Sequence, residues 1–370
     1  MSARDMFKRW LGAGEAAPPP GGASVEPPAS IDVVHREALQ RALSVVHGEG
    51  DVLVGPWTGE VGFELMYWIP FLAWLVDQGL RGDRLVVVSR GGAGLWYRHL
   101  TTRYVDILDL MTPDEFRERT AGKKKQYDAR RDLDRELLKK TRDRLGLDEV
   151  PVVHPSAMFR LFVGLWRRHA GIDLVESFAR FQPLTPPPAM ERPAGLPSDY
   201  VVAKFYFSKA FPDTVENRAF VSHVLRTVSR QVPVALLSTS VRLDEHSDYQ
   251  SHPGTGVFVV DALETPQKNL ERQTGLIAGA RGFVGTYGGF SYLAPFYGVP
   301  SLSFFSRHGF ETHHLDLAQQ VFGRLLPGGF LALDRREAAL VDPAVNRWSA
   351  ASASAAGMRE QDSERARAAR

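Results

Sequence analysis

Two adjacent glycines in the second half of the chain have the residue type that lets a ligand approach the backbone closely. Gly288 and Gly289 lie in a turn over residues 286–290, between an apolar strand expected over 282–285 and a short helix that Ser291 is expected to cap. Glycine adopts positive φ and has no side chain. The free N–H groups of the helix's first turn would then point at the ligand, and phosphate is the usual anion there. The alternative is a tight turn that binds nothing.

The elements on either side of this turn favour a ligand. Gly298 and Pro300 end the short helix, and a second apolar strand begins at Ser301. A helix of about two turns between two buried strands is typical of a parallel sheet, and such sheets bind ligands at the ends of their strands. The residues predicted to bind the anion are Thr286, Tyr287, Gly288, Gly289, Phe290 and Ser291.

Two lysines could add positive charge to this site. Lys204 lies inside the strand YVVAK that opens the second half, and Lys209 lies in the loop that follows. Either ammonium could donate a charge-assisted hydrogen bond to a phosphate. The sequence leaves both lysines as candidates.

A carboxylate in a glycine-flanked loop follows the first expected strand, DVLVGPW. Glu60 comes directly after Gly59 and shortly before Gly62. An acid at the carboxyl edge of the first strand of an α/β sheet lies where such sheets bind substrates, so Glu60 is the candidate general base, with simple exposure on a turn as the alternative. Glu64 falls in the first turn of the following aromatic-rich helix, where it could instead stabilise the helix start.

Two further polar residues follow strands in the first half. Arg90 comes soon after the strand expected over 85–88, and His154 ends the short strand in PVVHPS. Arg90 could bind an anionic part of a substrate or form a surface salt bridge. For His154 we weigh a role on the substrate side against a structural one.

No metal or other cofactor is expected. His313 and His314 are adjacent, and two successive residues of a helix cannot face one metal ion, so a zinc site is not predicted. The chain has no cysteine, which excludes disulfides and thiolate catalysis.

Composition describes an ordinary globular protein. The 370 residues carry a formal net charge of +2, from 45 basic and 43 acidic residues, which argues against a nucleic-acid partner held by bulk charge. The longest apolar run, over 65–76, is interrupted by Pro70 and is too short to span a bilayer. The N-terminus lacks an apolar secretory segment, so we expect a cytoplasmic protein. The charged stretch 112–146 is expected to form solvated helices.

Proline-rich stretches divide the chain. Residues 1–30 are expected to be a flexible arm, whose aromatic and basic start could make weak contact with a membrane surface. Residues 182–199 contain six prolines and are expected to link two domains, over 31–181 and 200–343. Residues 344–370 have no core pattern and are expected to be a disordered tail or a frayed helix. The fold class is α/β, with two Rossmann-like domains that face each other across a cleft.

This organisation resembles the GT-B glycosyltransferases. The segment NLERQTGLIAGARGFVGTYGGFSYLAPFYGVPSLSFF resembles their nucleotide-sugar-binding region, and GPWTGEVGFELMYWIPFL resembles the strand and loop on the acceptor side. The resemblance covers residues from about 50 to 325. It implies that the turn at 286–291, with Lys204 or Lys209, binds the donor. The acceptor side would comprise Gly59, Gly62, Glu64, Arg90 and His154, with Glu60 as the base.

The implied function is transfer of a sugar from a nucleotide sugar to a hydroxyl acceptor, without a metal, in polysaccharide or glycoconjugate synthesis. The two domains would close on each other so that donor and base meet. A nucleotide-sugar epimerase and a non-catalytic protein that binds sugar nucleotides or glycans are the alternatives. The paired glutamates of many retaining members are absent from the second half, which leaves inversion or retention open.

Overall fold

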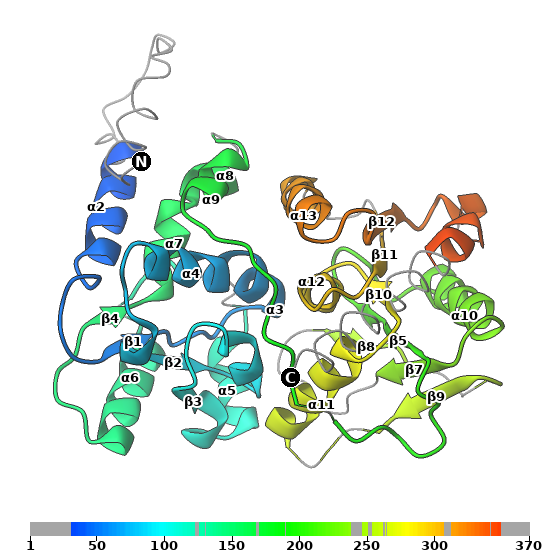
Figure 1. Cartoon of the computed structure of the whole chain (residues 1–370), viewed down its shortest axis with the longest axis horizontal. Coiled ribbons are helices and arrows are strands. Elements are labelled where there is room, and N and C mark those ends of the chain that lie inside the picture. The colour runs from blue at the N-terminus through cyan, green and yellow to red at the C-terminus, as the bar shows by residue number, and fades with distance from the viewer. Residues whose placement is uncertain are drawn as a thin grey trace, which may run out of the picture.

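The computed structural model describes residues 31–122, 126–129, 131–167, 170–188, 190–237, 246–250, 254–261, 263, 265–306, 312–340 and 342–348. The predicted arm over 1–30 and most of the predicted tail lie outside these residues. The described chain forms two α/β parts that lie side by side, one before and one after the proline-rich segment (Figure 1).

The first domain contains a four-stranded parallel sheet with the order β3-β2-β1-β4. Its strands are β1 (Val52–Val54), β2 (Leu85–Ser89), β3 (Tyr104–Asp106) and β4 (Val152–Val153). Its α-helices are α2 (Ile31–Leu43), α3 (Val61–Phe63), α4 (Ile69–Asp77), α5 (Pro113–Thr120), α6 (Asp132–Leu145), α7 (Pro155–Leu161), α8 (Val163–Trp166) and α9 (Asp173–Ser177). A π-helix, η1 (Glu64–Trp68), joins α3 to α4, and short 3₁₀ turns are η2 (Gly82–Arg84), η3 (Ala93–Tyr97) and η4 (Ile107–Asp109).

The second domain contains a six-stranded parallel sheet with the order β12-β11-β10-β5-β7-β9. Its strands are β5 (Val201–Lys204), β7 (Val234–Leu237), β9 (Val257–Val260), β10 (Gly282–Thr286), β11 (Ser301–Phe305) and β12 (Phe330–Asp334). Its helices are α10 (Val215–Ser229), α11 (Pro266–Ala278), α12 (Gly289–Phe296), α13 (Thr312–Leu325) and the 3₁₀ turn η5 (Ala338–Leu340). A small antiparallel pair, β6 (Tyr206–Phe207) with β8 (Ser247–Asp248), extends from the end of β5.

In both sheets, strands are first added on one side of the first strand and then on its other side. In the six-stranded sheet the chain moves from β5 through β7 to β9, then returns to the other side of β5 with β10, β11 and β12. The four-stranded sheet does the same, since β4 lies on the free side of β1. This strand order is that of Rossmann-like domains, so the predicted fold class of two such α/β domains is confirmed.

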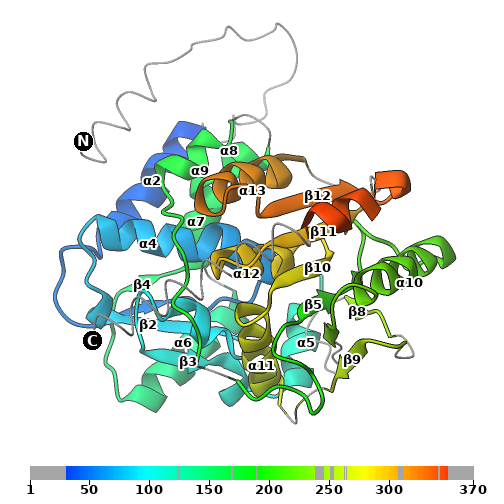
Figure 2. The ribbon, with the colours of Figure 1, turned by 45° about the vertical axis from the view of Figure 1, so that its right-hand side comes forward.

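The two domains pack directly against each other. One cluster of buried apolar side chains includes residues of both sheets and of the helices between them. The Tyr67 hydroxyl lies 2.5 Å from Nδ1 of His314 on α13, and Trp96 Nε1 donates to Thr274 Oγ1 on α11 at 3.1 Å. In Figure 2, as in Figure 1, α12 lies between the six-stranded sheet and the helices of the first domain.

The proline-rich segment runs across this junction, and its described residues form neither helix nor strand. Leu184 and Leu196 are buried, and the Leu184 N–H donates to the carbonyl of Phe296 at the end of α12, at 2.9 Å. Just before it, the Arg180 N–H donates to the carbonyl of Pro70 on α4, at 2.8 Å. The segment is therefore attached to both domains.

Several helices begin or end at particular residues. Thr265 caps α11, accepting the Lys268 N–H at 3.3 Å. Helices α7 and α8 follow one another with a break at Phe162, which ends the first and precedes the second. Residues 342–348 form a helix that buries Val345 and Trp348, so ordered structure continues past the predicted start of the tail. Among the described residues, no helix has the length and apolar character needed to span a membrane.

Candidate functional site

The candidate site lies where the six-stranded sheet changes direction, between β5 and β10. Adjacent parallel strands whose crossover helices lie on opposite faces leave a crevice at their carboxyl ends, and ligands bind there. Lys204 is the last residue of β5, and Thr286 is the last residue of β10. The predicted glycine turn therefore follows one of the two strands that form the crevice.

Tyr206, just after β5, holds the glycine turn in place. The Thr286 hydroxyl donates to the Tyr206 carbonyl at 2.9 Å and accepts the Tyr206 N–H at 3.0 Å, and the Tyr206 phenol donates to the Tyr287 carbonyl at 3.1 Å. Gly288 has φ 142°, and a Cβ on it would come 2.1 Å from the Tyr206 hydroxyl. The turn thus requires glycine at this position for both conformational and steric reasons.

Helix α12 begins three residues earlier than predicted. Gly288 occupies the N-cap position, so the expectation that Ser291 is the N-cap is wrong. The Ser291 hydroxyl instead accepts the Gly288 N–H at 3.0 Å and donates to the Gly288 carbonyl at 2.8 Å. Ser291 therefore stabilises the turn from within the first turn of the helix.

Gly289 lies against the first domain rather than in open space. A Cβ on Gly289 would come 2.7 Å from Val61 Cγ1 and 3.1 Å from the Gly62 backbone nitrogen. Gly289 is also not among the glycines with positive φ. The expectation that Gly289 is needed for positive φ is wrong, because close contact with Val61 and Gly62 explains this glycine.

Two helix N-termini meet at this contact. Residues 61–77 form one continuous helical stretch through α3, η1 and α4, and the backbone of Gly62 in its first turn faces Gly289, the first residue of α12. Each helix N-terminus carries about half a positive charge from its aligned peptide dipoles. The predicted acceptor-side glycine loop and the predicted anion-binding turn are thus brought together at an electropositive junction.

Glu60 lies at this junction. It is the N-cap residue of α3 with an extended backbone, φ −75° and ψ 148°, and is half-buried. Its carboxylate makes no capping hydrogen bond to the helix. The structure therefore places Glu60 one residue from the Val61–Gly289 contact, opposite the glycine turn as the sequence predicted.

Glu64 points into the core of the first domain. Its Oε1 accepts hydrogen bonds from the Ser89 hydroxyl and the Tyr97 phenol, both at 2.5 Å, and only 1% of the residue is exposed. Burial raises the pKa of Glu64 to about 7, against the opposing effects of the two hydrogen bonds and the charge of Arg90. Glu64 thus links η1 to the end of β2 rather than capping the helix.

Arg90 and His154 hold the loops of the first domain. Arg90 donates from Nε and Nη2 to the Gly59 carbonyl, at 3.2 and 2.6 Å. His154 caps α7, where its Nδ1 accepts the Ser156 N–H at 3.0 Å, and its Nε2 lies 3.2 Å from Asp134 Oδ2. Both side chains are buried, and the contacts make Arg90 the support of the loop that carries Glu60.

The two candidate lysines differ in their surroundings. Lys204 is buried, its Nζ lies 2.6 Å from Asp248 Oδ2 and 5.4 Å from the centre of the Phe290 ring. Lys209 is exposed in the loop after β6, next to Ala210, whose carbonyl accepts both the N–H and the hydroxyl of Ser306 at 2.9 Å. The chain therefore passes from the end of β5 to the end of β11. Because β10 lies between these two strands, the segment before Lys209 crosses the end of β10.

The structure adds residues that sequence reasoning missed. Tyr206 and Asp248 belong to the β6–β8 pair beside Lys204, and neither was a candidate. The position of Tyr206 two residues after Lys204 was the available signal. Asp248 follows a long segment, and nothing local places it beside β5.

No metal centre is found among the described residues, in which groups of three or more histidine, cysteine, aspartate or glutamate side chains suited to a metal ion are absent. Asp132 and Asp134 have the spacing of an Asp-x-Asp motif. They lie on different faces of α6, since the Asp132 side chain is exposed and the Asp134 side chain is buried.

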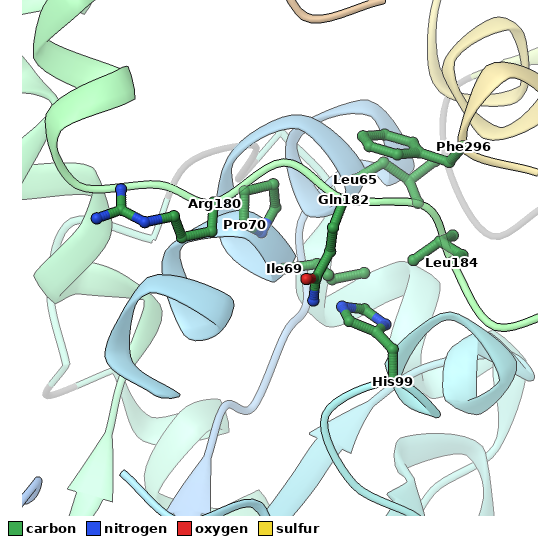
Figure 3. A pocket seen from close by; sticks show the side chains of 8 residues that line it. All are labelled: Leu65, Ile69, Pro70, His99, Arg180, Gln182, Leu184 and Phe296. Carbon is green, nitrogen blue, oxygen red and sulfur yellow. The ribbon is translucent and has the colours of Figure 1, made fainter. Parts of the chain in front are cut away.

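A small pocket lies at the C-terminal end of α12, where that helix faces the first domain. Helix α4 and η1, the proline-rich segment and the end of α12 all contribute to it (Figure 3). His99 projects into it towards Gln182, and burial lowers the pKa of His99 to about 4, so its imidazole is neutral near neutral pH. The pocket is lined by Leu65, Ile69, Pro70, His99, Arg180, Gln182, Leu184 and Phe296.

Comparisons with known proteins match structures of glycosyltransferases. No protein-family model matches the chain, and no curated protein matches it. The E. coli heptosyltransferase WaaC with ADP is 12% identical, with a TM-score of 0.40 over 77% of this chain and 93% of that one. The glycosyl transferase family 9 protein from Veillonella parvula DSM 2008 is 8% identical, with a TM-score of 0.43 over 82% of this chain and 91% of that one.

A third structure, E. coli ADP-heptose lps heptosyltransferase II, is 8% identical, with a TM-score of 0.40 over 77% of this chain and 90% of that one. The matched proteins belong to the class that the sequence resembles. Because the identities are 12% or less and the TM-scores are below 0.5, the roles of residues in this chain are argued from its own geometry.

Proposed function

We propose that this protein transfers a sugar from a nucleotide sugar to a hydroxyl group of an acceptor. One observation carries the proposal: the N-termini of α12 and of the helical stretch 61–77 meet at the carboxyl ends of two Rossmann-like sheets, with a carboxylate beside them. A nucleotide sugar brings its own leaving group, so the protein needs donors for the charge that develops on the diphosphate and a base for the acceptor hydroxyl.

The donor's diphosphate is assigned to the turn after β10. Backbone N–H groups at the start of α12 would donate to phosphate oxygens, and the partial positive charge of two helix ends favours an anion at that point. Lys209 is the better candidate for an added cation, because its ammonium is exposed whereas that of Lys204 is buried with Asp248. This arrangement of N–H groups and a lysine can neutralise the leaving group without a metal.

The acceptor hydroxyl is assigned to the first domain, with Glu60 as the general base. Arg90 fixes the Gly59 carbonyl through two hydrogen bonds and so holds the loop from which Glu60 extends. Proton removal by a carboxylate within hydrogen-bond reach of the hydroxyl raises its nucleophilicity as the glycosidic bond to the diphosphate breaks. Synthesis of a polysaccharide or glycoconjugate would use this reaction.

A panel of nucleotide sugars tests the proposal. Thermal shift identifies which nucleotides bind, and an assay of the bound donors then measures release of the product nucleotide with and without sugar acceptors. Acceptor-dependent release supports transfer, conversion of the donor to an isomer supports the epimerase, and binding without turnover supports a non-catalytic protein. If no nucleotide raises the melting temperature, the proposal is wrong.

A further inference from the structure

A second set of buried polar groups lies at the direction change of the four-stranded sheet, between β1 and β4. The loop after β1 carries Thr58, and His154 follows β4. The side chain of Gln126 binds this loop, since its Oε1 accepts the Thr58 N–H at 3.0 Å and its Nε2 donates to the Pro56 carbonyl at 2.9 Å. Its Nε2 also lies 3.5 Å from Asp134 Oδ2 on helix α6. This is the same position in the fold as the crevice of the second domain.

Asp134 is the centre of this set. Its side chain is fully buried, and three donors converge on one oxygen, Oδ2: His154 Nε2 at 3.2 Å, Gln126 Nε2 at 3.5 Å and Arg131 Nη1 at 3.7 Å. The other oxygen, Oδ1, is buried and has no hydrogen-bond partner. A buried carboxylate oxygen without a partner costs free energy unless a ligand donates to it.

The surrounding groups also have unused hydrogen-bonding capacity. Both Nη1 and Nη2 of Arg131 and the Thr58 hydroxyl are buried without a hydrogen-bond partner. Buried polar groups in folded proteins are nearly always paired, so several unpaired groups joined by one network at a strand-end position indicate a binding site.

We propose that Thr58, Arg131 and Asp134 bind a sugar unit that carries an oxyanion beside a hydroxyl. The planar guanidinium of Arg131 has two terminal nitrogens that make no hydrogen bond within the protein, although Nη1 lies 3.7 Å from Asp134 Oδ2, and this pair suits the two oxygens of a carboxylate or phosphate. Asp134 Oδ1 accepts from a hydroxyl of the ligand and not from an anion, so the ligand needs both groups. The identification of this sugar as the acceptor rests on the proposed function, whereas the site itself does not.

The probes for the test are glucose 6-phosphate, glucuronate, glucose and inorganic phosphate, each added without nucleotide. We expect glucose 6-phosphate or glucuronate to raise the melting temperature of the full-length protein more than glucose or phosphate alone does. The stronger of the two charged sugars identifies the oxyanion as phosphate or carboxylate. Equal shifts with all four probes, or no shift with any, would overturn the proposal.

Variants assign the effect to these residues. Arg131→Gln should weaken binding of the charged sugar about tenfold or more, the loss expected when a charge-assisted pair is removed. Arg135→Gln is the matched control, because Arg135 lies on α6 one turn after Arg131, its side chain is 65% exposed, and it pairs with Asp132 at the surface. A charged sugar that binds Arg131→Gln as tightly as the wild type would refute the site.

A second variant covers the case in which Arg131→Gln does not fold. Thr58→Val removes a hydroxyl that has no partner within the protein, so its melting temperature should not fall, while binding of the charged sugar weakens. Unchanged sugar binding in Thr58→Val would contradict the site. Nucleotide binding is measured separately: if the charged sugar binds at Arg131 and no nucleotide binds the wild type, the site stands and the proposed glycosyl transfer falls.

Discussion

Protonation of Glu64 should make the stability of the protein depend on pH. Its pKa is raised from 4.5 to about 7 because the carboxyl is buried beneath η1. The folded state therefore holds this proton more tightly than the unfolded state, and the contribution to the free energy of unfolding is complete below pH 4.5 and is lost as the pH rises through about 7. At 1.36 kcal/mol per pH unit, the difference corresponds to about 3 kcal/mol.

Glu64→Gln isolates this contribution. Glutamine keeps an oxygen that can accept from Ser89 and Tyr97 but has no charge to bury. Urea unfolding of both proteins over the same pH range should show the wild type losing about 3 kcal/mol relative to the variant as Glu64 ionises. All other titrating groups are the same in the two proteins, so their contributions cancel when the two free energies of unfolding are subtracted.

Tyr97→Phe tests the same reasoning by removing one of the two hydrogen bonds to Glu64. The phenol of Tyr97 donates to Glu64 Oε1 and so favours the ionised carboxylate. Its removal should raise the pKa of Glu64 further, so the fall in stability should still begin near pH 4.5 but should continue to a higher pH and become larger. A difference between wild type and Glu64→Gln that stays constant over the whole pH range would refute the reasoning.

Three further outcomes are expected. Glu60→Gln should lower turnover about 100-fold or more at unchanged donor affinity, whereas loss of turnover in Glu64→Gln instead would show that the base was wrongly chosen. Gly289→Val should lower the free energy of unfolding by about 1–3 kcal/mol and impair nucleotide binding, because its side chain would overlap Val61. The control, Gly323→Ala on the exposed face of α13, should not destabilise the protein. Equal melting temperatures of the two variants would contradict this prediction. Lys204→Met should lower the free energy of unfolding by about 3–5 kcal/mol, because it breaks the largely buried ion pair with Asp248. Calorimetry of Lys209→Met, at unchanged melting temperature, should show weaker nucleotide binding.

Local patterns in the sequence predicted most of the strands that carry the site. The apolar run ending at Ser89 and the run before the glycine turn both became central parallel strands, since strands buried on both faces are continuously apolar. The loop with Glu60 and the turn with Gly288 were placed at strand ends for the same reason. Their meeting across the domain junction agrees with the prediction that the two loops face each other.

Features that depend on distant contacts could not be predicted. The role of Tyr206 depends on β5 lying beside β10, and these strands are separated in the chain by β6, β7, β8 and β9. The sequence also could not show that Gly289 is required by Val61, because the contact joins two domains. The π-helix η1, which accompanies the inward position of Glu64, has no sequence signature of its own.

Asp134 shows how a local signal can be hidden by composition. The stretch around α6 is strongly charged, and this average predicted solvated helices. Within the helix, however, Leu137, Leu138 and Thr141 are buried together with Asp134, and they follow it at the three-, four- and seven-residue spacing of one helix face. An aspartate on the apolar face of a helix needs partners inside the protein. Position on the helix face, rather than the charge of the stretch, was therefore the informative signal, and it leads to the unpaired oxygen on which the proposed sugar site depends.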